Sequence, residues 1–299
     1  MKDDRHFGGA KLRLAISGQL LAQTHDLPRI LETLGSLGVD AIEIWPHNLP
    51  GGETREEQGR YEHKDIAGAR EILASHEMSV ACVTLGFDIL GRCAEVGPGY
   101  GTEALKGAVD AAAALEAPLV NCYLAGIIQP LFVEAMRPAA EYAGSLGITI
   151  VLENEAHDDS GIAIGVRSIV EAVRSPHFGT VYDPCNYYQA NEEPYPAAYE
   201  IVKDYVRYVH LKGGCQYDPE RRPNDHRGGT LRGREDRYIG YTSIQEGAIN
   251  ADGILRRLTR DGYTGFVTLE PHVPAEKALE YYRIEVPYVL SRLRQEAAA

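Results

Sequence analysis

Four stretches in the second half of the chain decide the fold, because each is a short apolar run that ends on a carboxylate or an imidazole. They read ITIVLE (148–153), GTVYD (179–183), RYVH (207–210) and GFVTLE (265–270). Runs of β-branched and aromatic residues are typical of β-strands. Parallel strands bring their carboxyl ends to one rim of a sheet, so we expect the four terminal side chains to converge on one point.

Strand-like and helix-like segments alternate along the whole chain. The eight strand candidates are residues 12–17, 41–45, 80–85, 119–123, 148–153, 180–183, 208–211 and 266–270. This alternation indicates a parallel sheet with right-handed crossovers. It predicts an α/β fold, a single (β/α)8 TIM barrel over residues 1–299, with the ordered barrel spanning about 10–295. A doubly wound sheet is the alternative, but the turn after the first strand, Ser17-Gly18-Gln19, lacks the usual glycine-rich phosphate-binding pattern.

Capping residues mark several helices between these strands. Asp26, with Pro28 behind it, is expected to start a helix that stops before Gly38. Asn250 precedes the last helical pattern before the final strand, and an alanine-rich helix is expected to start at Thr102. The longest connection, residues 213–249, is predicted to be a rim loop after the seventh strand that serves as a substrate lid or a partner surface.

Composition narrows the classes of partner. The net charge of −13 and the absence of a clustered basic face argue against a nucleic-acid partner. Residues 1–9 are polar and no apolar run is long enough to cross a bilayer, so no membrane partner is expected. Five cysteines without a CxxC pair are typical of a reducing compartment, so we expect a cytoplasmic location.

The strand-end residues predict a metal site. They are Glu153, Asp183, His210 and Glu270. Taken singly, each could be a helix cap or a surface charge, but a ring of such side chains would repel or stay undercompensated without a cation. Three carboxylates and an imidazole make an oxygen-rich set, so one divalent ion is expected, Mn²⁺ ahead of Mg²⁺, Co²⁺ or Zn²⁺.

The same residues lie in motifs that resemble a known family. LENE (152–155), YDPCN (182–186), VHLKG (209–213) and GYTGFVTLEPH (262–272) are similar to those of the xylose-isomerase-like TIM-barrel family, which includes ketose 3-epimerases and inosose dehydratases. The resemblance covers essentially the whole chain. It implies that the two glutamates, the aspartate and the histidine bind one divalent ion. It also implies that Glu153 and Glu270 form the catalytic acid/base pair.

Three positions depart from the ketose 3-epimerase pattern. Asn186 stands where those enzymes usually have a histidine, and Gln216 stands where they usually have an arginine. Asp159, six residues after Glu153, replaces a glutamate. These changes concern substrate contacts and leave the metal motif intact.

Seven residues near the predicted rim are candidate substrate contacts: Glu43, Trp45, Asn121, Asp159, Asn186, Lys212 and His272. Trp45 could stack on a sugar or pack the barrel mouth. Lys212 could polarise a substrate oxygen or neutralise the acidic cluster. His272 could contact substrate or support its loop.

The leading functional prediction is a divalent-metal-dependent isomerase or epimerase of a keto sugar or sugar derivative. Removing a proton beside a carbonyl gives an enediolate, whose charge a metal stabilises. The alternative is a lyase on the same scaffold, either a keto-polyol dehydratase or a C-glycoside deglycosidase of 3-keto sugars, because the same first step can expel a neighbouring group. We expect a small-molecule carbohydrate substrate, and leave open a homo-oligomer or a small partner subunit.

The sequence argues against two further classes of function, a nucleic-acid repair enzyme and a non-catalytic scaffold. An abasic-site endonuclease shares the fold but needs extra histidines, and Thr84, Asn121 and Asn186 occupy the relevant strand ends here. A non-catalytic scaffold would be favoured by a lost ligand, and all four ligand candidates are present.

Overall fold

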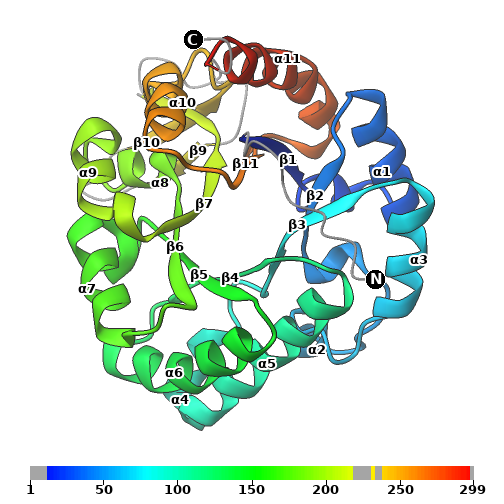
Figure 1. Ribbon diagram of the computed structural model, residues 1–299, viewed down its shortest axis with the longest axis vertical. Coiled ribbons are helices and arrows are strands. Elements are labelled where there is room, and N and C mark those ends of the chain that lie inside the picture. Colours follow the sequence, from blue (N-terminus) through cyan, green and yellow to red (C-terminus); the bar gives the residue numbers. More distant parts are fainter. Residues whose placement is uncertain (1–11, 218–229, 233–237, 297–299) are drawn as a thin grey trace, which may run out of the picture.

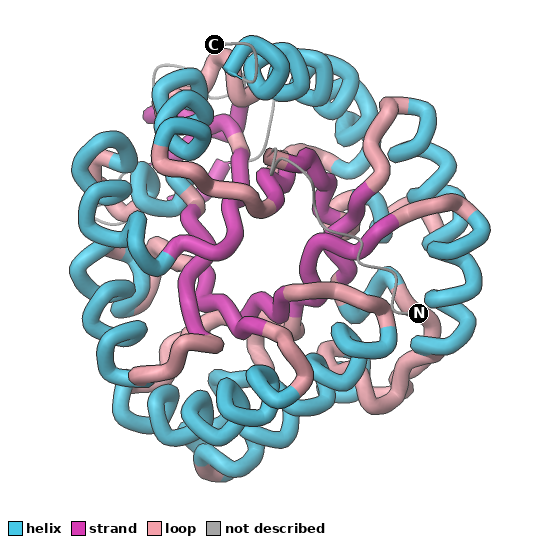
Figure 2. Tube along the Cα trace, viewed as in Figure 1, coloured by secondary structure: helices cyan, strands magenta, loops and turns pink. Residues whose placement is uncertain are grey.

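The computed structural model describes residues 12–217, 230–232 and 238–296. Eight parallel strands close into a barrel in the order β1-β11-β7-β6-β5-β4-β3-β2. Figure 1 shows the strands in the centre with the helices outside them, and Figure 2 shows the same ring in magenta inside the cyan helices. The (β/α)8 prediction is confirmed. The expected start of the ordered barrel, residue 10, lies outside the described residues.

The strands fall where the apolar runs placed them. Their bounds are β1 Arg13–Ser17, β2 Ala41–Ile44, β3 Ser79–Thr84, β4 Leu119–Cys122, β5 Thr149–Glu153, β6 Phe178–Tyr182, β7 Val206–Leu211 and β11 Phe266–Leu269. Two strands, β6 and β7, begin two residues earlier than predicted. Asp183 and Glu270 follow the last strand residue directly, whereas Glu153 and His210 lie within their strands.

Helices surround the barrel. The longer ones are α1 Leu27–Ser36, α3 Ile66–Ser75, α5 Pro98–Ala114, α6 Gln129–Ser145, α7 Ala163–Val173, α10 Ala251–Arg260 and α11 Ala278–Glu296. Shorter ones are α2 Arg55–Gln58, α4 Cys93–Val96, α8 Pro184–Gln189 and α9 Tyr199–Val202. Among the described residues, no helix combines the length and apolar character needed to span a membrane.

The capping predictions can be checked atom by atom. The Asp26 carboxylate accepts from the Arg29 backbone N–H, and the Asn250 side chain accepts from that of Gly253. The predicted start at Thr102 is wrong, because α5 begins at Pro98. A proline is well suited to the first position of a helix, where its missing N–H has no intrahelical partner anyway. Thr102 is instead buried in the second turn and donates to the Ala135 carbonyl of α6.

The barrel interior changes from apolar to polar along the strands. Further from the carboxyl ends of the strands, the interior is a small buried cluster of mostly apolar side chains. It includes Ala15, Ala41, Leu119, Val151, Val181, Tyr208 and Phe266. Alternate strand residues face the same side, so the next inward residue is two positions further on. Those residues are Ser17, Glu43, Asn121, Glu153, Asp183, His210 and Thr268, all buried. The fold therefore concentrates polar side chains at the carboxyl-end mouth of the barrel.

The described parts of the connection after β7 contain strands, where the sequence predicted a loop. These strands are β8 Gly213–Tyr217, β9 Thr230–Arg232 and β10 Tyr238–Thr242, which pair antiparallel in the order β8-β10-β9. Ile239 and Tyr241 of β10 are buried. Antiparallel pairing joins segments that are far apart along the chain, so local sequence patterns gave no sign of it.

Candidate metal centre

The four strand-end residues meet at the barrel mouth. Each of Glu153, Asp183, His210 and Glu270 offers one ligand atom, and these atoms all lie within 4.8 Å of one another. All four side chains are buried, with at most 4% of any residue exposed. Buried carboxylates this close together are costly unless a cation compensates them. The donor set and its spacing fit one divalent cation.

The two carboxylate oxygens of Asp183 have different roles: one caps a helix, and the other points into the cluster. Oδ1 caps α8 by accepting from the backbone N–H groups of Cys185 and Asn186, at 2.8 and 3.0 Å. Oδ2 is buried and makes no hydrogen bond of good geometry within the part of the chain that the structure describes, and it lies 2.8 Å from the Lys212 ammonium. The capping interpretation of this residue is thus correct, and it leaves the second oxygen aimed at the cluster.

His210 lies between three glutamates. Its Nδ1 is 3.2 Å from Glu153 Oε1 and 3.4 Å from Glu270 Oε2, and its Nε2 is 2.7 Å from Glu43 Oε2. Burial lowers the pKa of the imidazole, but Glu153, Glu43 and Glu270 outweigh it and raise the pKa well above its ordinary value. The two ring nitrogens therefore have different neighbours. Nδ1 faces Glu153 and Glu270 of the cluster, and Nε2 faces Glu43 behind it.

Lys212 supplies positive charge inside the cluster. Its Nζ lies 2.8 Å from Asp183 Oδ2 and 3.0 Å from Glu270 Oε2, and its side chain is only 2% exposed. Burial opposes its charge, but these carboxylates raise the pKa of Lys212 well above the ordinary value. Burial also pushes the pKa of Glu270 upward, yet Lys212 and His210 hold it well below its usual range. This placement supports the neutralising role considered for Lys212.

Glu43 and Trp45 do not lie on the open rim as predicted. Glu43 is fully buried beneath His210, and the Trp45 indole N–H donates to Glu43 Oε1 at 2.7 Å. Trp45 is 4% exposed, and its ring lies near that of Tyr123, with the centroids 6.0 Å apart. This geometry corrects the predicted substrate contact of Glu43, because its carboxylate is occupied by side chains of the protein.

Two asparagines that were predicted to contact substrate donate hydrogen bonds to the Glu153 carboxylate. Asn121 donates through Nδ2 to Glu153 Oε2 at 2.9 Å, while its buried Oδ1 has no hydrogen-bond partner among the described residues. Asn186 donates to Glu153 Oε1 at 3.4 Å and to the Asn154 carbonyl at 2.8 Å. Both residues lie beside the predicted acid/base group, and their contact with substrate stays a prediction.

The remaining two candidates differ in position. His272 Nε2 is 3.5 Å from both Glu270 Oε2 and Lys212 Nζ, so it borders the cluster. Asp159 has an exposed side chain in the 3-10 helix η4 (Asp159–Gly161) and is not one of the clustered residues. The structure does not bring Asp159 to the site, because the turn after β5 directs it outward.

Sequence reasoning missed two residues at the mouth. Glu155 Oε1 accepts from Asn186 Nδ2 at 3.3 Å, and burial together with Glu153 raises the pKa of Glu155 to about 8. Its position two residues after Glu153 was a usable signal, since alternate residues of an extended chain share a side. Tyr241 comes from β10, and its ring lies 4.9 Å from that of His272, centroid to centroid. Its placement depends on the β8-β10 pairing, which had no local signal.

With this geometry established, comparison with protein families gives one assignment. Residues 31–286 match the family model described as xylose isomerase-like TIM barrel. The chain therefore belongs to the xylose isomerase-like TIM-barrel family, as the motifs suggested. A comparison with curated proteins finds no match.

Solved structures with the same fold include enzymes of more than one reaction class. D-allulose 3-epimerase from Methylomonas sp., in complex with D-allulose, has a TM-score of 0.68 and 16% identity over 96% of this chain and 98% of that one. The probable 3-DHS dehydratase AsbF from Bacillus anthracis has a TM-score of 0.68 and 14% identity, covering 93% and 99%. A family member from Mycobacterium smegmatis in complex with magnesium has a TM-score of 0.69 and 16% identity, covering 96% and 98%. At these identities the likeness shows the fold alone.

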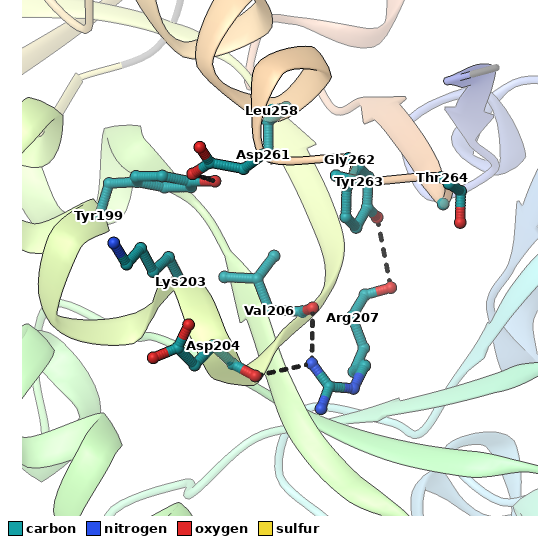
Figure 3. A pocket seen from close by; sticks show the side chains of 11 residues that line it. Tyr199, Lys203, Asp204, Val206, Arg207, Leu258, Asp261, Gly262, Tyr263 and Thr264 are labelled. Carbon is teal, nitrogen blue, oxygen red and sulfur yellow. Dashed lines mark hydrogen bonds between the residues drawn. The ribbon is translucent and has the colours of Figure 1, made fainter. Parts of the chain in front are cut away.

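Two hollows lie at opposite ends of the barrel. One of about 630 Å³ lies at the carboxyl end, with His47, Pro271, His272 and Val273 in its lining; of these, His272 lies 3.5 Å from Glu270 of the cluster. The other, of about 540 Å³, lies where β7 and β11 begin (Figure 3). There the Arg207 guanidinium donates to the carbonyls of Asp204 and Val206, so its charge is already engaged. TIM-barrel active sites lie at the carboxyl end, which favours the first hollow.

Proposed function

We propose that this protein is a divalent-metal-dependent isomerase or epimerase of a keto sugar or sugar derivative. The observation that carries the proposal is the buried cluster of Glu153, Asp183, His210 and Glu270, with ligand atoms within 4.8 Å of one another. Glu153, Asp183, His210 and Glu270 would hold the ion, with Mn²⁺ or Mg²⁺ preferred by the oxygen-rich set. When bound, such an ion supplies a Lewis acid that polarises a carbonyl group.

The two glutamates supply the proton chemistry. Glu153 and Glu270 come from β5 and β11, which are separated in the barrel by β6 and β7. Carboxylates from separate strands can reach the two faces of one substrate carbon, so one removes the proton and the other returns it. Asn121 and Asn186 orient Glu153, and Lys212 and His272 border Glu270.

The hollow at the carboxyl end, which His272 lines, bears on the class of substrate. Its described lining combines Gln19, Gln23, His47 and His272 with Leu20, Ala22, Pro271 and Val273. Neither lysine nor arginine occurs among these residues, although phosphate groups are usually gripped by such cations. This supports a neutral carbohydrate over a sugar phosphate.

A lyase reaction is the second candidate, supported by a third carboxyl group at the mouth. Glu155 lies beside Asn186, which also contacts Glu153. Elimination needs an acid for the leaving group in addition to the base that removes the proton, and Glu155 is placed to supply one. The AsbF structure, described as a probable dehydratase, shares the fold.

The test is isotope exchange with product analysis. Purified protein loaded with Mn²⁺ is incubated with a panel of neutral ketoses, inososes and 3-keto glycosides in D₂O. Deuterium in recovered substrate or product, at the carbon beside the carbonyl, supports the proposal. A changed stereocentre or a shifted carbonyl then indicates the isomerase, and a lost water or aglycone indicates the lyase. Turnover without exchange or bond loss at that carbon would refute both.

A further inference from the structure

Three buried side chains, from β1, β2 and the residue that follows β2, lie behind His210, and Glu43 among them contacts its ring. Glu43 accepts from the Ser17 hydroxyl at 3.0 Å and from the Trp45 indole N–H at 2.7 Å, both at Oε1. Its other oxygen, Oε2, lies 2.7 Å from His210 Nε2. Ser17, Glu43 and Trp45 are 1%, 0% and 4% exposed.

The hydrogen-bond directions assign the role of each atom. Ser17 and Trp45 can each donate to Oε1, and a carboxylate only accepts. Glu43 Oε2 therefore accepts from Nε2–H of His210. That bond holds a hydrogen on Nε2 whether the ring is charged or neutral, so a metal would be bound through Nδ1, on the side of Glu153 and Glu270.

We propose that Glu43 is a positioning residue for the metal centre, and that Ser17 and Trp45 hold it in place. Glu43 sets the tautomer and the ring orientation of His210. The half of the barrel formed by β1 to β4 contributes no ligand to the cluster, but through Glu43 it influences how tightly the metal binds. A carboxylate behind a ligating histidine orients the ring and raises its basicity, and loss of such a partner weakens metal binding about 10-fold to 100-fold. The inference rests on the metal site proposed above.

The geometry separates this role from two others. Glu43 is not among the residues whose ligand atoms lie within 4.8 Å of one another, so it is not placed as a fifth ligand. Both of its oxygens already face donors of the protein, and the residue is fully buried, so it is not placed to bind substrate.

The primary experiment measures Co²⁺ and Mn²⁺ dissociation constants of the full-length protein by calorimetric titration. Glu43→Gln keeps the shape of the side chain, but it replaces one carboxylate oxygen with an amide group that donates, where the wild-type carboxylate accepts from Ser17, Trp45 and His210. We expect its dissociation constants to rise about 10-fold to 100-fold. Ser17→Ala removes a single support of Glu43, and we expect a smaller rise.

A matched control is Glu285→Gln. Glu285 is also a fully buried glutamate that accepts one hydrogen bond, from the Ile244 backbone N–H, but it lies on α11. We expect its metal dissociation constants to match the wild type. Melting temperatures of all metal-free variants separate an effect on the metal from an effect on folding.

An independent readout is the ¹H–¹⁵N spectrum of histidine-labelled wild-type protein with diamagnetic Zn²⁺. We expect a slowly exchanging Nε2–H signal that is missing in His210→Gln. This measurement keeps the inference testable even if Glu43→Gln does not fold.

The outcomes are distinguishable. Unchanged metal affinity in a folded Glu43→Gln protein, or a metal on Nε2 of His210, would overturn the positioning role and leave the proposed function standing. Failure of the wild type to bind either ion would overturn the metal site itself, and the positioning role with it. An equal loss of affinity in Glu43→Gln and Glu285→Gln would indicate a general packing effect and would also overturn the inference.

Discussion

The two halves of the barrel mouth use similar strand positions for different purposes. On β5 to β7 and β11, the inward residues at the strand ends direct their charged atoms toward one point. On β1, β2 and β4, the matching residues Ser17, Glu43 and Asn121 donate to or accept from side chains instead. A carboxylate at a strand end is therefore a ligand or a support according to its partners. Glu43 and Glu153 show that residue type alone does not decide between them.

The largest expected effect is the loss of metal binding when a residue of the ligand half, formed by β5, β6, β7 and β11, is changed. Asp183→Asn and His210→Ala should each remove most metal binding and abolish activity. Asparagine is as good a helix cap as aspartate, so Asp183→Asn should keep α8 and the fold. Metal content by mass spectrometry and far-UV circular dichroism measure the two effects. Full metal occupancy in the double variant would contradict the ligand assignment.

The next effect concerns the proton-transfer pair. Glu153→Gln and Glu270→Gln should each lower kcat by about 10²- to 10⁴-fold, the usual contribution of a general acid or base. Each variant is assayed at saturating Mn²⁺, because both glutamates are also predicted ligands. Glu285→Gln, a buried glutamate outside the mouth, is the control and should keep kcat. Near-wild-type kcat in a metal-saturated Glu153→Gln or Glu270→Gln protein would remove that residue from the mechanism.

A third effect is on stability and tests the charge balance within the ligand half. Lys212→Met should destabilise the metal-free protein by about 3–5 kcal/mol, because Asp183 and Glu270 lose a buried counter-charge. A divalent ion replaces the missing charge, so the loss should be smaller with saturating Mn²⁺. Urea unfolding with and without metal measures both values.

The control for that comparison is Lys203→Met, which removes a partly exposed pair with Glu200. Surface pairs contribute about 0–1 kcal/mol, so its effect should be small and independent of metal. An equal loss for Lys212→Met in both metal states would show that the lysine does not compensate the same charges as the ion.

A fourth effect, seen only as a dependence on pH, separates burial alone from burial beside a cation. Burial raises the pKa of Glu285 to about 8 from an ordinary value of 4.5. The folded state therefore favours the protonated carboxyl. Its stabilising contribution is complete below about pH 4.5 and is lost as the pH rises toward 8, by up to about 1.4 kcal/mol per pH unit.

Glu285→Gln has no such titration. Relative to this variant, the wild type should lose stability between pH 5 and pH 8 in urea unfolding. A constant difference between the two proteins over that range would show that Glu285 is not protonated in the folded state.

Much of the fold could be predicted because its signals are local. The run ITIVLE predicts a strand that ends at Glu153, and β5 ends there. Asp26 and Asn250 predict helix starts from their own capping chemistry, and both cap as expected. The start of α5 was misplaced because the prediction rested on Thr102, whereas the helix begins at Pro98 after Gly97.

The sequence by itself determined the barrel, the polar layer at its mouth and the four residues that meet there, because strand spacing and the shared carboxyl rim follow from local periodicity. Only the tertiary structure decided which side chains support that cluster. Glu43 reaches His210 across 167 positions of the chain, and Tyr241 reaches His272 through a strand pairing. It also directed Asp159 outward and Glu155 inward, because the turn after β5 takes its course from packing. Such contacts join distant segments, so no local pattern encodes them.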